Sequence, residues 1–158
     1  MVELKLQVNY RCYASTTELP VEYQELLDCA KKALSKSYSP YSAFKVGAAI
    51  LLEDSTLVQG ANQENSAYPL CLCAERNALA VANIQYPSQK IKAMAVVAEK
   101  ESIFVSPCGA CRQVIWENEL RNEAPILLFI QGPNGTVYRF DSVADLLPFG
   151  FTGKDLLE

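Results

Sequence analysis

The sequence predicts an α/β fold: a three-layer α/β/α sandwich around a mixed five-stranded sheet that carries an extra N-terminal strand. The main observation is the order of segments, because those with strand patterning and those with helical spacing alternate along the chain. A second is the length of 158 residues, which suffices for one hydrophobic core and would leave two poor ones. No repeat, low-complexity tract or linker interrupts the sequence. We therefore expect a single domain over 1–158, with 1–18 as the N-terminal strand extension.

Hydrophobic patterning places the elements of the N-terminal half. Apolar and polar residues alternate through 2–12, which predicts a half-buried strand. Pro20 suits the first turn of a helix, and the apolar residues after it are three and four apart, which predicts an amphipathic helix over 20–36. The apolar run 44–52 is followed by a polar turn and the segment 56–60, which together predict a hairpin.

The C-terminal half continues with helices and strands in alternation. A Gly-Pro-Asn-Gly turn at 132–135 separates the last two strands. The expected elements are helices over 73–82, 108–120 and 141–146, and strands over 91–98, 126–130 and 136–140.

Composition and charge exclude several classes of function. Half of the residues are apolar and a fifth are charged, as in a packed domain and unlike a disordered chain. The formal net charge is −4 and the 14 basic residues form no cluster, so we expect no nucleic-acid partner. No apolar run approaches the ~20 residues that span a bilayer, and the N-terminus lacks the features of a signal peptide. We expect a cytoplasmic protein without a membrane partner.

The six cysteines and the absence of histidine are more informative. In a reducing compartment, thiols favour metal binding or catalysis over a disulfide framework. Without histidine, proton transfer falls to other side chains, and a transition-metal site must be built from thiolates or carboxylates. Cys12 and Cys29 lie on apolar faces of their predicted elements, and we expect both to be inert core residues.

Three of the cysteines have the spacing of zinc ligands. Cys108 and Cys111 form a C-x-x-C at the start of a predicted helix, and Cys73 opens another helix. Three protein ligands and a water are typical of catalytic zinc, whereas structural sites use four ligands. Cys71 provides an alternative, because with it the set becomes a four-thiolate structural site.

Two charged residues follow Cys73. The carboxylate of Glu75, at the start of a helix, can point toward a zinc-activated water and accept its proton. Three thiolates leave zinc with a net charge of −1, which the two helix N-termini and the guanidinium of Arg76 would offset. The alternatives are a helix-capping acid at Glu75 and an ordinary surface residue at Arg76.

The motif CAER at 73–76, followed by PCGACRQ at 107–113, resembles the small homotetrameric cytidine deaminases of the zinc deaminase superfamily. The resemblance implies one Zn²⁺ per subunit on Cys73, Cys108 and Cys111, with Glu75 as the catalytic acid and base. It also implies the family's reaction, in which an activated water attacks C4 of cytosine. Cytidine and 2′-deoxycytidine would become the uridine forms with release of ammonia, a step of pyrimidine salvage.

The resemblance extends to residues that would bind the nucleoside. Phe44, in the segment SPYSAFKVGAA, corresponds to a phenylalanine that packs against the pyrimidine, although it also fits a plain core position. Asn62 and Glu64 match the family's N-x-E-N, which holds ribose hydroxyls. Tyr68 would line the same pocket, and the backbone N–H of Ala74 would meet the base carbonyl.

The C-terminal segment is similar to the one that sends a phenylalanine into a neighbouring subunit's site. It assigns Phe151, with Phe149 as the alternative, and implies a homotetramer with shared active sites.

Other functions remain open from the sequence. Blasticidin-type and other small-nucleoside aminohydrolases are the enzyme alternative, although blasticidin-type enzymes lack the ribose motif. A zinc-stapled structural module is the non-enzyme alternative, and a redox C-x-x-C would leave a metal-free protein with a reactive Cys108. Editing and deoxycytidylate deaminases usually open with H-x-E, which a chain without histidine cannot contain.

Overall fold

The computed structural model describes residues 1–100 and 102–153 and confirms the α/β class; 154–158 of the predicted domain lie outside the described residues. Its main elements are β1 (Arg11–Tyr13), α1 (Val21–Ala33), β2 (Val46–Leu52), β3 (Leu57–Ala61), α2 (Ala74–Gln85), β4 (Ile91–Ala98), α3 (Gly109–Asn122), β5 (Leu127–Gln131) and β6 (Val137–Phe140). Short 3₁₀ helices cover Thr16–Glu18, Leu34–Lys36, Tyr68–Leu70, Pro133–Gly135 and Val143–Leu146. The predicted boundaries of most elements are confirmed to within a few residues.

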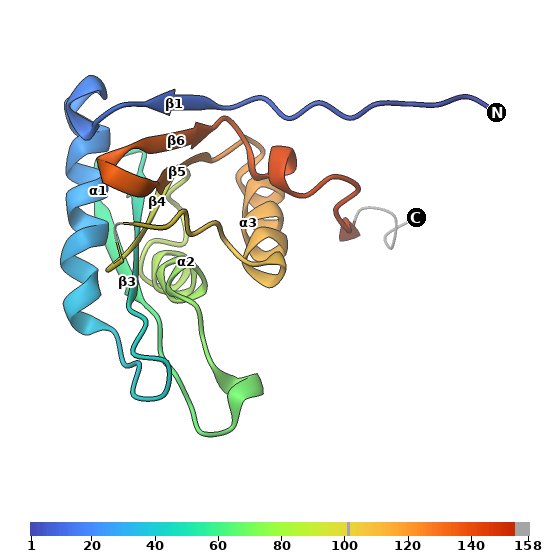
Figure 1. Ribbon diagram of the computed structural model, residues 1–158. Helices are drawn as coiled ribbons and strands as arrows, with labels where there is room; N and C mark the ends of the chain where they lie inside the picture. The colour runs from blue at the N-terminus through green and yellow to red at the C-terminus, as the bar shows by residue number, and fades with distance from the viewer. Residues whose placement is uncertain (101, 154–158) are drawn as a thin grey trace.

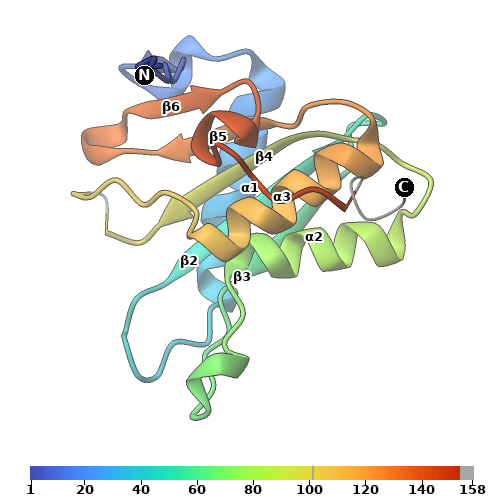
Figure 2. The same ribbon diagram turned by 90° about the vertical axis from the view of Figure 1, so that its right-hand side faces the viewer.

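One mixed sheet forms the middle layer, with strand order β1-β6-β5-β4-β2-β3. It has six strands rather than five, because the short N-terminal strand joins it. The helix α1 covers one face, and α2 and α3 lie side by side on the other (Figures 1 and 2). The strands β4 and β5 are parallel and are joined through α3. Because α2 follows β3, α3 follows β4, and both strands run antiparallel to β2, the two helices begin at the same end of the sheet.

The buried residues separate into one cluster on each face of the sheet. Along β2, Ala48 and Ile50 belong to the cluster under α2 and α3, and Ala49 and Leu51 belong to the one under α1. Such a strand is buried on both faces, which is why its sequence is an uninterrupted apolar run. In the described part of the chain, no helix is both long and apolar enough to cross a membrane.

The prediction of a half-buried strand over 2–12 was wrong for most of its length. Only Arg11–Tyr13 pair with β6, and residues 1–10 are exposed. The register explains this result: Arg11 lies opposite Arg139, so the residue before Arg11 already faces the last residue of β6. Earlier residues therefore have no strand opposite them.

The two cysteines that were predicted to be core residues differ in their exposure to solvent. Cys12 is exposed, so that prediction was wrong; the edge strand that carries it is not covered there. Cys29 is half-buried and packs against the cluster under α1.

Gly60 in β3 allows α2 to lie directly against the sheet. A Cβ at this position would overlap the carbonyl oxygen of Ala74 and the backbone nitrogen of Ala78. Because Ala74 is the first residue of α2, this contact sets the height of the helix start above the sheet.

Gly60→Ala is expected to lower the free energy of unfolding by about 1–3 kcal/mol, because the methyl group would meet helix backbone that cannot rotate away. Chemical denaturation followed by circular dichroism measures this change. Gly153→Ala is the matched control: no described atom lies within 4 Å of its added Cβ. Equal stability of the two variants would contradict the close approach of α2.

Candidate active site and metal centre

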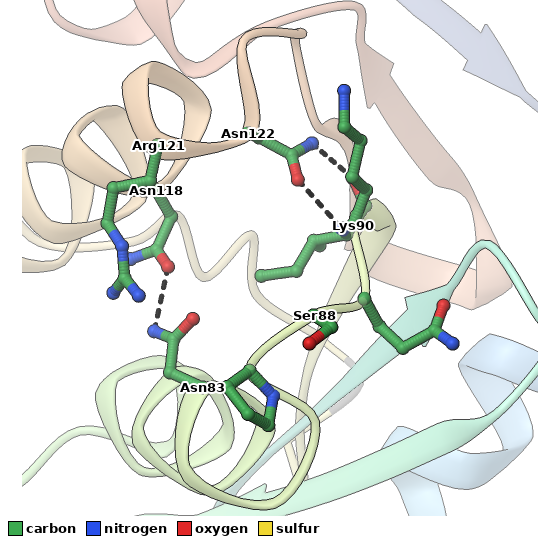
Figure 3. A pocket seen from close by; sticks show the side chains of 9 residues that line it. Asn83, Ser88, Lys90, Asn118, Arg121 and Asn122 are labelled. Atoms are coloured by element: carbon green, nitrogen blue, oxygen red, sulfur yellow. Dashed lines mark hydrogen bonds between the residues drawn. The ribbon is translucent and has the colours of Figure 1, made fainter.

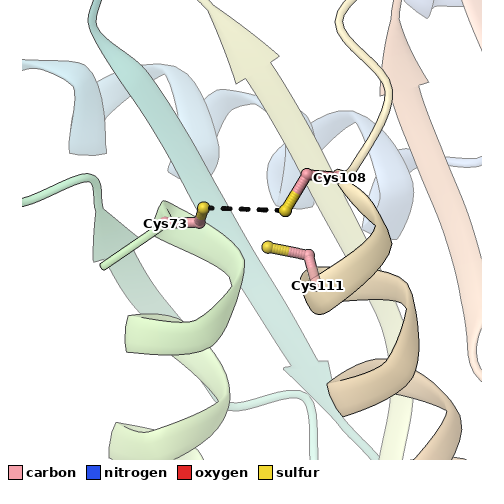
Figure 4. Close-up of side chains that lie close together, drawn as sticks. All are labelled: Cys73, Cys108 and Cys111. Carbon is pink, nitrogen blue, oxygen red and sulfur yellow. Dashed lines mark hydrogen bonds between the residues drawn. The ribbon is translucent and has the colours of Figure 1, made fainter. Parts of the chain in front are cut away.

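Three cysteine thiols meet where α2 and α3 begin (Figure 4). Cys73 directly precedes α2, Cys108 directly precedes α3, and Cys111 lies in the first turn of α3. Their sulfur atoms all lie within 4.8 Å of one another, and the Sγ atoms of Cys73 and Cys108 are 4.0 Å apart. The structure therefore brings together the three cysteines that the spacing selected.

The thiols of this cluster interact through their protons. A hydrogen bond from the Cys111 thiol lowers the pKa of Cys73 to about 6, and Cys108 adds a second, smaller effect in the same direction. The pKa of Cys111 is raised, first because its thiol donates that bond and second because its side chain is buried. The N-terminus of α2 also favours a thiolate at Cys73.

This donor set suits a zinc ion. Tetrahedral Zn–S bonds of ~2.3 Å place neighbouring sulfurs roughly 3.8 Å apart, close to the 4.0 Å between Cys73 and Cys108. Three ligands leave the fourth position open, as in catalytic sites. Cys71 lies outside the cluster, and its sulfur accepts a hydrogen bond from the backbone N–H of Asn65 at 3.2 Å. The four-thiolate alternative is therefore not the arrangement of the described residues.

Glu75 places a buried carboxyl beside the cluster. It lies in the first turn of α2 and is only 4% exposed. Burial raises its pKa, while hydrogen bonds from its own backbone N–H and from the Cys111 thiol act in the opposite direction. A carboxyl with a raised pKa holds a proton more readily than an ordinary one, which suits a group that accepts and returns a proton.

A cavity of about 270 Å³ opens next to Glu75. This volume is near the lower end of the roughly 300–1,000 Å³ typical of ligand sites, so the cavity suits a small molecule. Its lining combines the predicted residues Asn62, Glu64, Cys73, Ala74, Glu75 and Cys108 with Val46, Gln63, Cys71, Leu72, Val105 and Ser106. Of the last six, Cys71 had been considered only as an alternative zinc ligand. The other five were not predicted to contact a ligand, since nothing in their local sequence distinguishes them from ordinary loop or strand residues.

Asn62 and Glu64 also hold the loop that precedes β2. The Asn62 amide accepts hydrogen bonds from Ser37 Oγ at 2.6 Å and Val46 N at 2.9 Å, and donates one to the carbonyl oxygen of Phe44 at 2.9 Å. The Glu64 carboxylate accepts bonds from the hydroxyl and backbone N–H of Ser42. The hydroxyl bond is the main reason that the pKa of Glu64 is lowered.

Two aromatic residues predicted to contact substrate lie outside the cavity lining. Phe44 is half-buried, and the ammonium group of Lys100 lies 5.9 Å from the centre of its ring. Tyr68 is exposed and its ring meets that of Tyr41 edge-on at 5.9 Å. Neither position lies in the cavity of a single chain.

Arg76 and Phe151 line a different hollow, along the outer faces of α2 and α3. Arg76 favours the Cys73 thiolate electrostatically, as the smallest of the effects on the pKa of Cys73. Within 1–100 and 102–153, no hydrogen bond joins its guanidinium to a cysteine. Phe151 is exposed, and its carbonyl oxygen accepts a bond from Gln113 Nε2 at 2.9 Å.

Arg112 is a positioning residue that sequence reasoning missed. Its guanidinium donates hydrogen bonds to the carbonyl oxygens of Pro107 and Leu146 and to Ser106 Oγ, all at 2.8–2.9 Å. It thereby ties the loop before Cys108 to the C-terminal segment. Its place directly after Cys111 was visible in the sequence, but its distant partners were not.

A second hollow lies at the opposite ends of α2 and α3 (Figure 3). Its amide groups bond to one another and to the backbone: Asn83 donates to Asn118 at 2.9 Å, and Asn122 pairs with both the N–H and the carbonyl of Ile91. The first bond joins α2 to α3, and the bonds of Asn122 join α3 to the start of β4. The amide groups of this hollow therefore have a structural role.

Comparison with known proteins settles which family this chain belongs to. Residues 20–123 match the family described as cytidine and deoxycytidylate deaminase zinc-binding region. The chain belongs to this family. It is therefore an enzyme of a hydrolytic, zinc-dependent deaminase family, and the thiol cluster is where zinc fits.

Relatives of this deaminase chain support the assignment over most of its length. It is 43% identical to the cytidine deaminase of Sporosarcina psychrophila over 86% of this chain and 96% of that protein. It is 39% identical to the cytidine deaminase of Halalkalibacterium halodurans over 86% of this chain and 98% of that protein. The crystal structure of the Burkholderia pseudomallei cytidine deaminase resembles this structure with a TM-score of 0.71 over 82% of this chain and 98% of that one. The two sequences are 39% identical.

Chelation of zinc is expected to expose Cys73 to alkylation. With a pKa of about 6, the metal-free thiol would be mostly thiolate at neutral pH. The rate with iodoacetamide should therefore rise with pH to a plateau with its midpoint near 6, whereas an ordinary thiol has its midpoint at ~8.5. Timed alkylation and peptide mass spectrometry measure it, with the zinc-loaded protein as the protected control. A midpoint at the ordinary value would contradict the thiol arrangement.

Proposed function

We propose that this enzyme converts cytidine and 2′-deoxycytidine to uridine and 2′-deoxyuridine with release of ammonia, as a step of pyrimidine salvage in the cytoplasm. The observation that carries the proposal is the buried carboxyl of Glu75 beside a three-thiol cluster, on the wall of a cavity that suits a small molecule. Relatives that are named cytidine deaminase and span nearly the whole chain support the same substrate.

Cys73, Cys108 and Cys111 would hold one zinc ion per subunit, and the ion, when bound, supplies an acidified water as nucleophile at neutral pH. Glu75 accepts the proton of this water and delivers it to N3 of the base as the hydroxide adds to C4. The hydroxyl now on C4 gives up its proton, which passes through Glu75 to the exocyclic amine. The C4–N bond then breaks, ammonia leaves and the C4 carbonyl of the uridine forms. The burial of Glu75 keeps bulk water away from these transfers.

Binding of the nucleoside would use groups around the cavity. Ala74 begins α2, so its backbone N–H has no partner within the helix and can donate to the base carbonyl. Phe44 would pack against the pyrimidine, and Tyr68 would line the same pocket. Asn62 and Glu64 would bind the ribose.

Arg76 would moderate the charge of the ligand thiolates from outside the cavity. Its positive charge lowers the pKa of Cys73, as expected of a group that stabilises a thiolate. A guanidinium near three thiolates would limit the electron density that they place on zinc.

We further propose a homotetramer with shared active sites. Phe149 and Phe151 are 99% and 65% exposed in the single chain, on a segment after the last 3₁₀ helix. Exposed aromatic residues of this kind usually contact a partner. Phe151 would close the cavity of a neighbouring subunit.

Glu75→Gln is expected to reduce kcat by at least ~10²–10⁴, because the amide keeps the shape but cannot accept the proton. The decrease in cytidine absorbance measures turnover, and a zinc assay with thermal unfolding shows that metal and fold are kept. Cys111→Ser is the contrasting variant, since it should lose zinc. Near-normal turnover of folded, zinc-loaded Glu75→Gln would exclude the mechanism, and absence of turnover in the unchanged protein would favour a structural zinc module.

A chain that ends at Leu147 should have a higher KM for cytidine and a smaller mass in solution, while each subunit keeps its zinc. The truncation leaves the bond from Arg112 to the Leu146 carbonyl in place, so the loop before Cys108 stays held. Phe151→Ala should reproduce the rise in KM, and Phe149→Ala serves as its matched control. A fully active monomer at assay concentration would refute the shared site.

A further inference from the structure

The N-terminal arm, residues 2–10, extends from β1 into solvent (Figure 1). One side carries Val2, Leu4, Leu6, Val8 and Tyr10, whose exposed fractions lie between 40% and 87%. The other side is polar. A strand with one apolar face is stable in water only when that face is covered, and an extended backbone without a neighbour leaves its hydrogen-bonding groups open to another strand.

The arm leads into an edge of the sheet that is also free. Among the described residues, β1 pairs with β6 alone, so its other side has no strand. An incoming strand can therefore pair with the arm and β1 in one continuous ladder.

We propose that residues 2–12 of two copies of this chain pair as antiparallel strands about a two-fold axis at Gln7. In this register, residue number i of one copy lies opposite residue 14 − i of the other. It is the one register that pairs every member of the alternating run, and it joins the two sheets through their β1 edges. The contact is self-complementary, as a two-fold interface must be.

The apolar face fits this register. Directly opposite residues of an antiparallel pair lie on the same face of the sheet. The apolar pairs are Val2 with Cys12, Leu4 with Tyr10, and Leu6 with Val8, each formed twice.

An apolar hollow on the body of the protein continues this face. The Tyr10 ring lies 6.0 Å from that of Tyr138 and 5.7 Å from that of Phe140. Together with Val8, Phe104 and Leu146, these rings line a hollow of about 330 Å³. The second copy's Leu4, opposite Tyr10, would extend this apolar surface and cover its rim.

Charge on the polar face selects the same register. Arg11 and Arg139 lie directly opposite each other, and both guanidinium groups contact the single carboxylate of Asp141, at 3.6 and 2.8 Å. The site therefore has one positive charge in excess. The register places Glu3 of the second copy opposite Arg11, where it supplies the second carboxylate.

The neighbouring registers that keep the apolar faces together are less favourable. A shift by two residues in one direction would place Lys5 opposite Arg11, and a shift in the other direction would leave Glu3 opposite Asn9. The shorter register about Leu4 pairs Glu3 with Lys5 but leaves Val8 and Tyr10 outside the ladder. Like charges opposite each other destabilise a strand pair, whereas opposite charges stabilise it.

A cross-linking experiment on the full chain tests the pairing. In Gln7→Cys the two new thiols face each other across the axis, with Cβ atoms about 5 Å apart. A short bismaleimide should therefore trap a covalent dimer on a denaturing gel. Asn9→Cys is the matched control on the same face, because its two copies would be roughly 13 Å apart along the strand. The unchanged chain shows the background from the native cysteines.

Charge variants in the Gln7→Cys background test the register. Glu3→Arg places like charges opposite each other twice and should lower the yield of trapped dimer roughly fivefold. Lys5→Gln should leave it unchanged, because Lys5 faces Asn9 in this register. A dimer trapped equally by Asn9→Cys or Leu4→Cys, a loss with Lys5→Gln, or no trapped dimer at all would overturn the proposal.

Deletion of residues 2–9 separates this inference from the proposed reaction. The cavity beside Glu75 contains no residue of the arm, so deamination and zinc content should be kept. Sedimentation should show weaker association than in the full chain. Unchanged association over the full concentration range would overturn the pairing, whatever the enzyme's substrate.

Discussion

Cys73 and Cys108 each stand directly before a helix, and the starts of those two helices are close enough to bring the sulfur atoms within 4.0 Å. Three thiols in such a small space repel one another once they ionise. The N-termini of α2 and α3 offset this repulsion, because both present unpaired N–H groups and positive dipole ends to the same point. Without a metal the thiols share protons, and a zinc ion held by the three thiolates would take the place of those protons.

The position of Glu75 follows from the same helix start. A residue two places after Cys73 in the first turn of α2 faces inward, because Gly60 lets the helix lie against β3 with no side chain between them. The carboxyl is therefore buried by the packing of α2 on the sheet, and this burial raises its pKa. One packing contact thus positions a thiol of the cluster and raises the pKa of the carboxyl beside it.

The cluster and its helices were predictable because their signals are local: C-x-x-C and C-A-E both stand at the start of a helical pattern. The partners of Arg112 were not, since the Leu146 carbonyl lies 34 residues away and any residue can present one. The prediction of a strand over 2–12 was wrong for a related reason. Alternation records that a segment has two different faces, but the strand that it pairs with depends on where β6 ends.

Asn62 and Glu64, which we propose bind the ribose, show how residues can hold a loop and still have capacity for a ligand. An ionised carboxylate has about four acceptor positions, and Glu64 uses three of them, for Tyr41 N and for the backbone N–H and hydroxyl of Ser42. The amide nitrogen of Asn62 has two protons, and its bond to the Phe44 carbonyl uses one. One acceptor and one donor thus remain, which is what two vicinal hydroxyls need if one donates and the other accepts. Because the loop is already ordered by the other bonds, binding a nucleoside there would cost little further conformational entropy.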